Sequence, residues 1–351
     1  MTALLPPPER FSYELPAELE ASEPPEARGL TRDAVRMLVT HRGDQSLVPS
    51  SFTFLTRFLE PGDLVVVNTS GTIPAAVEAT GENGDPLIVH LSTQLDGARW
   101  VVEPRRVTGR ATGRWKGPPP GPHLLLEGGA SLDLDQPYGA AGRLWVAHLD
   151  VGRRVLSWLA VHGRPIRYSY VDRPWPIEMY QNVYATVPGS AEMPSAGRPF
   201  TPQMITRLVA MGVGVSPVVL HTGVASLEAD EVPYPERVCV PQVTADRVNQ
   251  ARATGHRVIA VGTTVVRALE SAAGPDGMAH GHDGWTELVI SPDHGVRLTD
   301  GMLTGWHEPA SSHLLMLEAL TGRELLAESY HAALAQSYRW HEFGDVHLIL
   351  P

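Results

Sequence analysis

The spacing of apolar segments changes along this chain of 351 residues, and that change constrains the fold more than any other feature. Between residues 73 and 149, short apolar runs such as PLIVHL, RWVVEP, HLLLEG and RLWVAHL each end at Gly, Pro, Asp or a short polar turn. Runs of this length with turn signals between them predict a small β-barrel or sandwich. The second half alternates strand-like and helix-like segments instead, which predicts an α/β layer.

Capping signals place the helices of the second half. Thr201 followed by Pro202 is a capping hydroxyl before a proline at the first helical position, and Gly212 ends that helix. Thr244 is predicted to open another helix, which Gly255 closes. The other predicted elements are a buried strand at 64–67, a polar turn at 68–71, strands in VSPVVLHTG and RVIAVG, a helix TTVVRALESAAG, helices at 311–320 and 323–337, and a last strand VHLILP.

These elements predict a large mixed α/β domain with an inserted small β-barrel-like domain. The large domain comprises residues 1–71 and 165–351, and the inserted domain comprises residues 72–164. With 351 residues and 43% hydrophobic content, the chain is long enough for two cores.

Composition excludes several classes of protein. Cys239 is the only cysteine, so no intrachain disulfide, thiolate metal cluster or CxxC redox pair can form. No apolar run is long enough for a membrane helix, and the N-terminus does not resemble a signal peptide, so we expect a cytoplasmic protein. The formal charge of −11 means that a nucleic-acid partner must be met by a local arginine patch, since Lys116 is the only lysine.

The segment RVIAVGTTVVRALES is the best local candidate for a ligand site. A buried strand ends at Gly262, Thr263 and Thr264 follow, and a helix begins at once. The first N–H groups of a helix have no internal partner and carry the positive end of its dipole, so they bind anions and carboxylates. Arg267 can add charge to the same pocket, with Glu270 as its ion-pair partner at i+3. A capped helix after a strand is also ordinary structure, and GxGxxG is absent.

Histidines at the ends of elements are the candidates for acid–base chemistry. His221 closes the strand VVLH, and strand ends in open α/β sheets are where ligands bind. His307 lies beside Glu308 in the loop GWHEPASSH and can act near neutral pH. His280 and His282 in GMAHGHDG have the spacing of metal ligands but are typical of a solvated loop, so we expect no metal. HExxH and GxSxG are both absent.

Several segments resemble those of a known enzyme family. FSYELP, LEPGDLVVVN, YQNVYA with PSAGRPFT, VVLHTG, VIAVGTTVVRALES, HEPASSHLLML and YRWHEFGDVHLIL come in the order and approximate spacing of the S-adenosylmethionine:tRNA ribosyltransferase-isomerase (QueA) family of the queuosine pathway. The resemblance runs from about Phe11 to Leu350. Its most specific block is VGTTVVRALES, followed by YQNVYA.

The resemblance implies S-adenosylmethionine as co-substrate and tRNA as partner. Members of this family attach the ribosyl part of S-adenosylmethionine to the aminomethyl group of a deazaguanine in a tRNA anticodon. They rearrange the sugar to an epoxycyclopentane and release adenine and methionine. A sulfonium acidifies the neighbouring C–H bond, so a modest base can start such a reaction. The family fold also agrees with the two domains expected above.

The local signals and the resemblance together predict the site. Residues 180–201 form a long loop without a lasting period, and such loops hold a ligand or lack order. The resemblance implies that this loop walls the pocket, with tyrosine rings facing a base or a sulfonium, although ordinary packing also explains the tyrosines. The predicted cofactor-binding residues are Tyr180, Gln181, Tyr184, Gly262, Thr263, Thr264 and Arg267. The predicted catalytic residues are His221 and His307 as base or acid, with Glu236 and Asp300 as their partners.

The chain departs from the family pattern at several positions. GLHFT is replaced by GRPFT at 197–201, and an MHSE-like block is replaced by PYPE at 233–236. NDTRVIPAR has become NTSGTIPAA at 68–76, and the lysine of TNFHLPKSTL is missing from the segment that begins at Thr304. Because fewer positive charges weaken RNA binding, the acceptor stays open.

Three functions are therefore compatible with the sequence. The first is ribosyl transfer and isomerisation onto tRNA. The second is a paralogue that uses S-adenosylmethionine with a small-molecule, non-tRNA acceptor. The third is a non-catalytic RNA-binding module. The sequence leaves the oligomeric state open, and a monomer is favoured.

Overall fold

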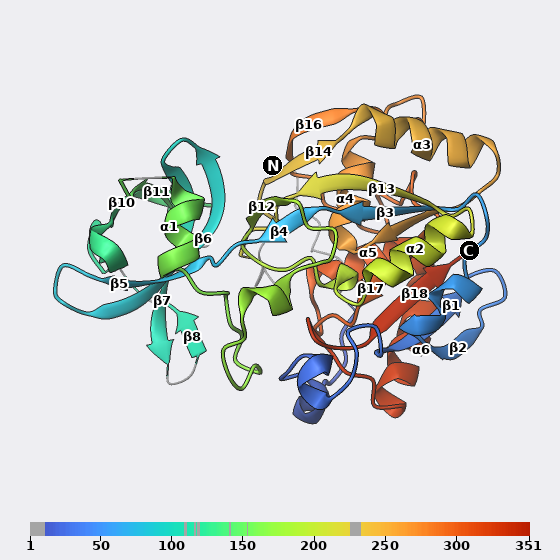
Figure 1. Ribbon diagram of the computed structural model, residues 1–351, viewed down its shortest axis with the longest axis horizontal. Coiled ribbons are helices and arrows are strands. Elements are labelled where there is room, and N and C mark those ends of the chain that lie inside the picture. Colours follow the sequence, from blue (N-terminus) through green and yellow to red (C-terminus); the bar gives the residue numbers. More distant parts are fainter. Residues whose placement is uncertain are drawn as a thin grey trace, which may run out of the picture.

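The computed structural model describes residues 11–108, 111–115, 117, 120–139, 142–152, 154–224 and 233–351. A barrel, at the left of Figure 1, is joined to a large sheet with helices on both faces, at the right. In spatial order the strands of the large sheet are β16 (His282–Thr286), β14 (Glu236–Val240), β13 (Gly214–Leu220), β3 (Leu64–Asn68), β15 (Val258–Val261), β17 (Gly301–Gly305), β18 (Val346–Leu350), β1 (Arg36–His41) and β2 (Leu47–Ser51).

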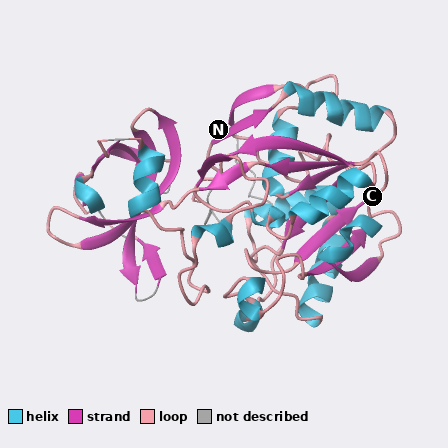
Figure 2. Ribbon diagram, viewed as in Figure 1, coloured by secondary structure: helices cyan, strands magenta, loops and turns pink. Residues whose placement is uncertain are grey.

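The large sheet is mixed. Strands β13, β3, β15 and β17 are mutually parallel, and β1 is parallel to β18, whereas the other neighbours are antiparallel. Figure 2 shows helices on both faces of this sheet. The helices of this body are α2 (Pro202–Ala210), α3 (Gln242–Ala253), α4 (Thr263–Ser271), α5 (Ser312–Thr321) and α6 (Arg323–Ala335).

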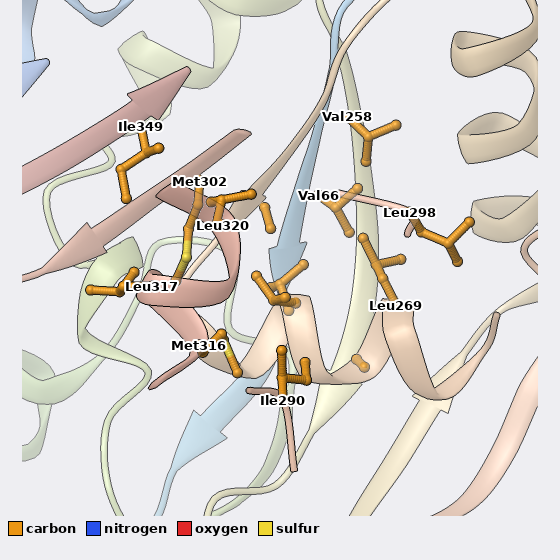
Figure 3. Packing of buried hydrophobic residues seen from close by; sticks show 14 of the residues in the cluster. Val66, Val258, Leu269, Ile290, Leu298, Met302, Met316, Leu317, Leu320 and Ile349 are labelled. Carbon is orange, nitrogen blue, oxygen red and sulfur yellow. The ribbon is translucent and has the colours of Figure 1, made fainter. Parts of the chain in front are cut away.

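Alternate residues of the central strands enter two different cores. Val66 and Val258 belong to the core that contains apolar side chains of α3, α4, α5 and α6, as Figure 3 shows with Leu269 and Leu317. Val65 and its alternate neighbours face the other core, with side chains of α2 and of the 3₁₀ helix η3 (Phe52–Arg57). Because both faces of β3 and β15 are buried, their sequences are continuous apolar runs rather than alternating ones.

The inserted barrel is built from six strands that close on themselves. The spatial order is β11 (Leu144–Asp150), β10 (Ser131–Tyr138), β9 (His123–Leu126), β5 (Ala76–Thr80), β6 (Pro86–Asp96) and β7 (Arg99–Thr108), and β8 (Ala111–Arg114) extends the sheet beyond β7. Pairing of β11 with β7 closes the barrel. Helix α1 (Val155–His162) contributes Trp158 and Leu159 to the barrel core.

Two short parallel strands join the bodies. Strand β4 (Ser70–Thr72) leads into the barrel and pairs with β12 (Val187–Ser190), which lies in the returning chain. The barrel also contacts the segment that follows β13. The Val224 N–H in that segment donates to Ser92 Oγ on β6 at 3.0 Å. The remaining 3₁₀ helices are η1 (Ala17–Leu19), η2 (Pro25–Arg28), η4 (Glu127–Gly129), η5 (Ile177–Tyr180) and η6 (Ser195–Gly197).

The predicted fold class is confirmed, with corrections to single elements. Thr201 caps α2 as predicted, because its Oγ1 accepts from the Met204 N–H at 3.1 Å. The polar turn predicted at 68–71 is wrong, since part of it forms β4. Helix α3 begins two residues before Thr244, directly after Pro241, and the Thr244 hydroxyl donates instead to the Pro217 carbonyl at 2.7 Å.

The described ranges contain no helix with both the length and the apolar character that crossing a bilayer requires. The domain limits at residues 71 and 165 stay a prediction.

Candidate active site

A cavity of about 230 Å³ lies where β15 and β17 end and α4 begins. Open α/β sheets bind ligands in this position, outside the carboxyl ends of the strands. We call it the α4 cavity. Its lining comprises Tyr168, Tyr170, Glu192, Met193, Pro194, Ser195, Ala196, Thr222, Gly262, Thr263, Thr264, Thr304, Gly305, Trp306, His307, Glu308, Ser311, Ser312, His313, His341 and Glu342.

The start of α4 is fixed by a glycine and a buried asparagine. Gly262 has a φ of 94°, which a residue with a side chain rarely adopts. After it, the N–H groups of Thr263 and Thr264 have no acceptor within the helix. Asn68, at the end of β3, donates to Thr264 Oγ1 at 3.2 Å and to the Leu220 carbonyl at 2.8 Å. The strand ends thus place in the lining of the cavity a helix start of the kind that can bind an anion.

An aromatic cluster holds the backbone of His307. The Tyr13 hydroxyl and the Trp340 indole N–H both donate to the His307 carbonyl, and the His307 N–H donates to the Tyr330 hydroxyl at 3.3 Å. The His307 ring places Nε2 2.8 Å from Thr304 Oγ1. The segments FSYELP and YRWHEF, at opposite ends of the chain, therefore both position this histidine.

His307 and His313 form a stacked pair of imidazoles. Their ring centroids are 4.6 Å apart, with 20° between the planes. Burial lowers the pKa of His307 well below its ordinary value. Burial, with a further contribution from the charge of Arg267, lowers the pKa of His313 to about 4. Both rings are therefore neutral at physiological pH and can accept a hydrogen bond or a proton.

The pKa of Glu342, on the same cavity, is shifted upward, whereas those of the two histidines are shifted downward. The Tyr170 hydroxyl donates to both carboxylate oxygens, at 2.8 and 2.7 Å. Burial raises the pKa of Glu342 to about 7, although the hydrogen bond from Tyr170 acts in the other direction. Tyr170 also stacks on His341, at 4.0 Å, and His341 has a left-handed φ of 72°. Backbone strain of this kind persists only where surrounding contacts impose it.

A second cavity of about 110 Å³ lies beside the first, between the barrel and the large sheet. We call it the Arg267 cavity. Arg267 donates to the carbonyls of Leu288, Tyr234 and Thr286 and to the carboxylate of Glu236. Burial raises the pKa of Glu236, against the opposing charge of Arg267. Thr222, Thr263, Thr264, Ser312 and His313 line both cavities.

Four of the predicted residues, Gly262, Thr263, Thr264 and His307, meet in the α4 cavity. Two more, Glu236 and Arg267, form an ion pair in the adjoining cavity. The predicted i+3 pairing of Arg267 with Glu270 is wrong. Glu270 instead accepts from the backbone N–H groups of Arg297 and Leu298.

His221 and Asp300 do not reach the α4 cavity. The His221 ring lies over Gly189, with Nδ1 2.7 Å from Ser70 Oγ, so it belongs to the β4–β12 junction. Asp300 precedes β17, whereas His307 follows it, so the two lie toward opposite ends of that strand. The Asp300 carboxylate accepts from the Val258 N–H at 2.9 Å. Asp300 therefore pairs with neither histidine.

The loop at 180–201 contributes its second half to the α4 cavity and not its first. Tyr180 packs on Phe343, with centroids 5.3 Å apart, and Tyr184 packs on Phe200 at 5.8 Å. The Gln181 side chain accepts from the Thr72 N–H and donates to the Thr72 carbonyl, which ties the loop to β4. The wall predicted from Tyr180, Gln181 and Tyr184 is therefore not part of the α4 cavity, and Tyr180 lines a separate cavity of about 740 Å³ beside β5 and β6.

Sequence reasoning missed the other side of the α4 cavity. Tyr168, Tyr170, His313 and Glu342 line it. Only His313 lies on a predicted helix, and the other three follow no periodic pattern that indicates a site. The available signal was the segment YRWHEFGD, which was matched to the family but was given no role. In the described ranges, no three His, Cys, Asp or Glu side chains come together as a metal site.

Comparison with known proteins gives a consistent result. Residues 8–349 match the family described as Queuosine biosynthesis protein. The chain is 35% identical to the S-adenosylmethionine:tRNA ribosyltransferase-isomerase of Moorella thermoacetica, over 97% of this chain and 99% of that one. Identity to the Thermotoga maritima protein of the same name is 33%, with coverage of 97% and 98%. A crystal structure of the S-adenosylmethionine tRNA ribosyltransferase from Thermotoga maritima covers 97% of this chain with a TM-score of 0.55 and 29% identity.

Proposed function

The chain belongs to the queuosine biosynthesis protein family, and we propose that it transfers and isomerises the ribosyl group of S-adenosylmethionine onto an aminomethyl deazaguanine in tRNA. Adenine and methionine are the released products. The observation that carries this proposal is the α4 cavity, in a chain that matches its named relatives over 97% of its length. The relatives' names supply the substrates, and the cavity supplies groups that suit them.

The start of α4 suits the amino-acid end of S-adenosylmethionine. A carboxylate is stabilised by free N–H groups and by the positive end of a helix dipole. Thr263 and Thr264 add hydroxyls at the same place. Four of the five N–H donors of Arg267 already bind groups within the protein, so we propose that its contribution to the ligand is mainly the positive charge beside α4.

The other walls suit the sulfonium nucleoside. Tyr168 and Tyr170 stack on each other with centroids 5.5 Å apart and offer an aromatic surface to a base or a cation. The neutral rings of His307 and His313 can orient polar groups without repelling a sulfonium. Holding the reacting groups in one orientation is itself a large part of such catalysis.

The proposal is tested by product release. The protein is incubated with S-adenosylmethionine and one of three acceptors: tRNA bearing the aminomethyl deazaguanine, the free aminomethyl base, or none. We expect adenine and methionine only with the modified tRNA. Release with the free base would instead establish a small-molecule acceptor. Binding of tRNA without release under any condition would overturn the proposal in favour of an RNA-binding module.

A further inference from the structure

We propose that Glu342 is the catalytic base, and that its carboxylate accepts the proton from a carbon attached to the sulfonium of S-adenosylmethionine. This inference rests on the proposed function and deepens it by naming the group that starts the reaction. Glu342 lines the α4 cavity together with the start of α4 and with His307. It belongs to the segment YRWHEFGD, which the predicted site residues do not include.

The carboxylate is held in one orientation and is still able to accept a proton. Tyr170 has a single hydroxyl proton, which is shared between the two oxygens at 2.8 and 2.7 Å, so both oxygens keep lone pairs. The Tyr170 ring is fixed by stacking on His341 at 4.0 Å and on Tyr168 at 5.5 Å. A base held in this way loses little freedom when the substrate arrives.

The charges around Glu342 leave it without a cationic partner in the cavity. The titratable groups whose charges or hydrogen bonds couple to Glu342 are Tyr168, Tyr170, Tyr180 and Glu308. The described residues that line the α4 cavity include no arginine or lysine. Arg198 stacks over the neighbouring Phe343, but its guanidinium is paired with Glu26.

That environment favours proton transfer from a cationic substrate. A sulfonium supplies the positive charge that the cavity lacks, and its arrival stabilises the ionised carboxylate. Burial raises the pKa of Glu342 to about 7, so it is a stronger base than an ordinary carboxylate, and about half of it is ionised at pH 7 before a substrate binds. His313, with a pKa of about 4, is a weaker base, and His307 Nε2 already contacts Thr304.

The step balances without any further reagent. The C–H bond beside the sulfonium breaks, and its electron pair stays on that carbon, next to the positive sulfur. The proton forms an O–H bond with Glu342, which becomes a neutral carboxylic acid. Tyr170 is a positioning residue in this step, because it acts only through the carboxylate.

The test compares Glu342→Gln with the wild-type protein. We expect turnover of S-adenosylmethionine with the modified tRNA to fall at least about 100-fold, the usual contribution of a general base. The dissociation constant for S-adenosylmethionine, measured by calorimetry, should change less than about threefold. Glu328→Gln is the control, because it removes an exposed carboxylate from α6 outside the cavity, and its turnover should stay within about twofold of the wild type. A Glu342→Gln protein that folds and keeps a third of its turnover would overturn the assignment.

A second variant tests the assignment even if Glu342→Gln folds poorly. Turnover should decline as the pH falls below about 7, because the base must be ionised. Tyr170→Phe removes a hydrogen bond that lowers the pKa of Glu342, so this decline should move to higher pH. An unmoved pH profile would contradict the role of Glu342. Wild-type protein that releases no adenine with any acceptor would remove the proposed function and this inference together.

Discussion

Two largely buried carboxylates beside α4, Glu236 and Glu342, differ in whether a cationic side chain lies next to them. Glu236 is neutralised by Arg267, whose other donors bind three backbone carbonyls. The side-chain hydrogen bond to Glu342 comes from the hydroxyl of Tyr170, and the described lining of its cavity has no arginine or lysine. The charge of Glu236 is balanced within the protein, whereas the ionised form of Glu342 would be stabilised by a bound cation. The comparison suggests that the Arg267 side of α4 stabilises the fold and that the Glu342 side acts on the substrate.

The largest expected effect follows from breaking the ion pair between Arg267 and Glu236. Arg267→Met leaves Glu236 without its counter-charge and removes the hydrogen bonds that Arg267 donates to three backbone carbonyls. Removing one partner of a buried ion pair typically lowers the free energy of unfolding by about 3 to 5 kcal/mol. Urea unfolding of the variant should show a loss of this size, while its affinity for S-adenosylmethionine falls less than about tenfold.

The double variant Arg267→Met with Glu236→Leu is the control for that loss. Removing both charges should recover part of the stability, because an apolar replacement of a buried pair is often neutral. If Arg267→Met were as stable as the wild type but lost affinity 100-fold or more, Arg267 would be a ligand-binding residue, and the comparison would be reversed.

The next largest effect is a gain in stability, expected when the carboxylate of Glu342 is removed. The pKa of Glu342 is raised from 4.5 to about 7 in the folded protein, so the folded state binds more protons than the unfolded state between these values. Stability from this group is therefore fully present below pH 4.5 and is lost as the pH rises through 7. Glu342→Gln should unfold at a higher urea concentration than the wild type at pH 8, and its free energy of unfolding should be larger by up to roughly 3 kcal/mol.

The same two proteins supply the control at low pH. Well below pH 4.5, at about pH 3, Glu342 is protonated in both the folded and the unfolded state, so the difference in stability between variant and wild type should shrink toward zero. A variant that is less stable than the wild type at pH 8 would show that the carboxylate supports the fold, as Glu236 does. Gain of stability with loss of turnover is the expected sign of a residue kept for activity.

Local features were predictable from the sequence, and distant pairings were not. The cap at Thr201 and the turn at Gly262 depend on neighbours in the chain, and both are present. The pairing of Arg267 with Glu270 was predicted from helical spacing, where a surface pair contributes only about 0.2 to 0.5 kcal/mol. Four hydrogen bonds in a largely buried setting outweigh that contribution, and one of them is to Glu236, 31 residues away.

The missed half of the site has the same physical cause. Tyr170 and Glu342 are 172 positions apart, and only the return of the chain from the barrel brings them together. No periodicity or capping rule encodes such a contact. The resemblance to a family identified YRWHEFGD as a segment of interest, but it did not say which of its side chains faces a ligand.

The smallest effect concerns the threonines that line both cavities. Thr263 lies at the first position of α4, where its N–H has no acceptor within the helix and its hydroxyl can donate to a carboxylate. Thr263→Val keeps the shape and removes the hydroxyl, so affinity for S-adenosylmethionine should fall about 3- to 10-fold, the worth of one hydrogen bond. Calorimetry measures this change, and Thr254→Val, at the end of α3, is the matched control with no expected effect on affinity. An equal affinity for both variants would mean that the helix N–H groups alone hold the ligand, and that the polar contribution of α4 comes from its backbone.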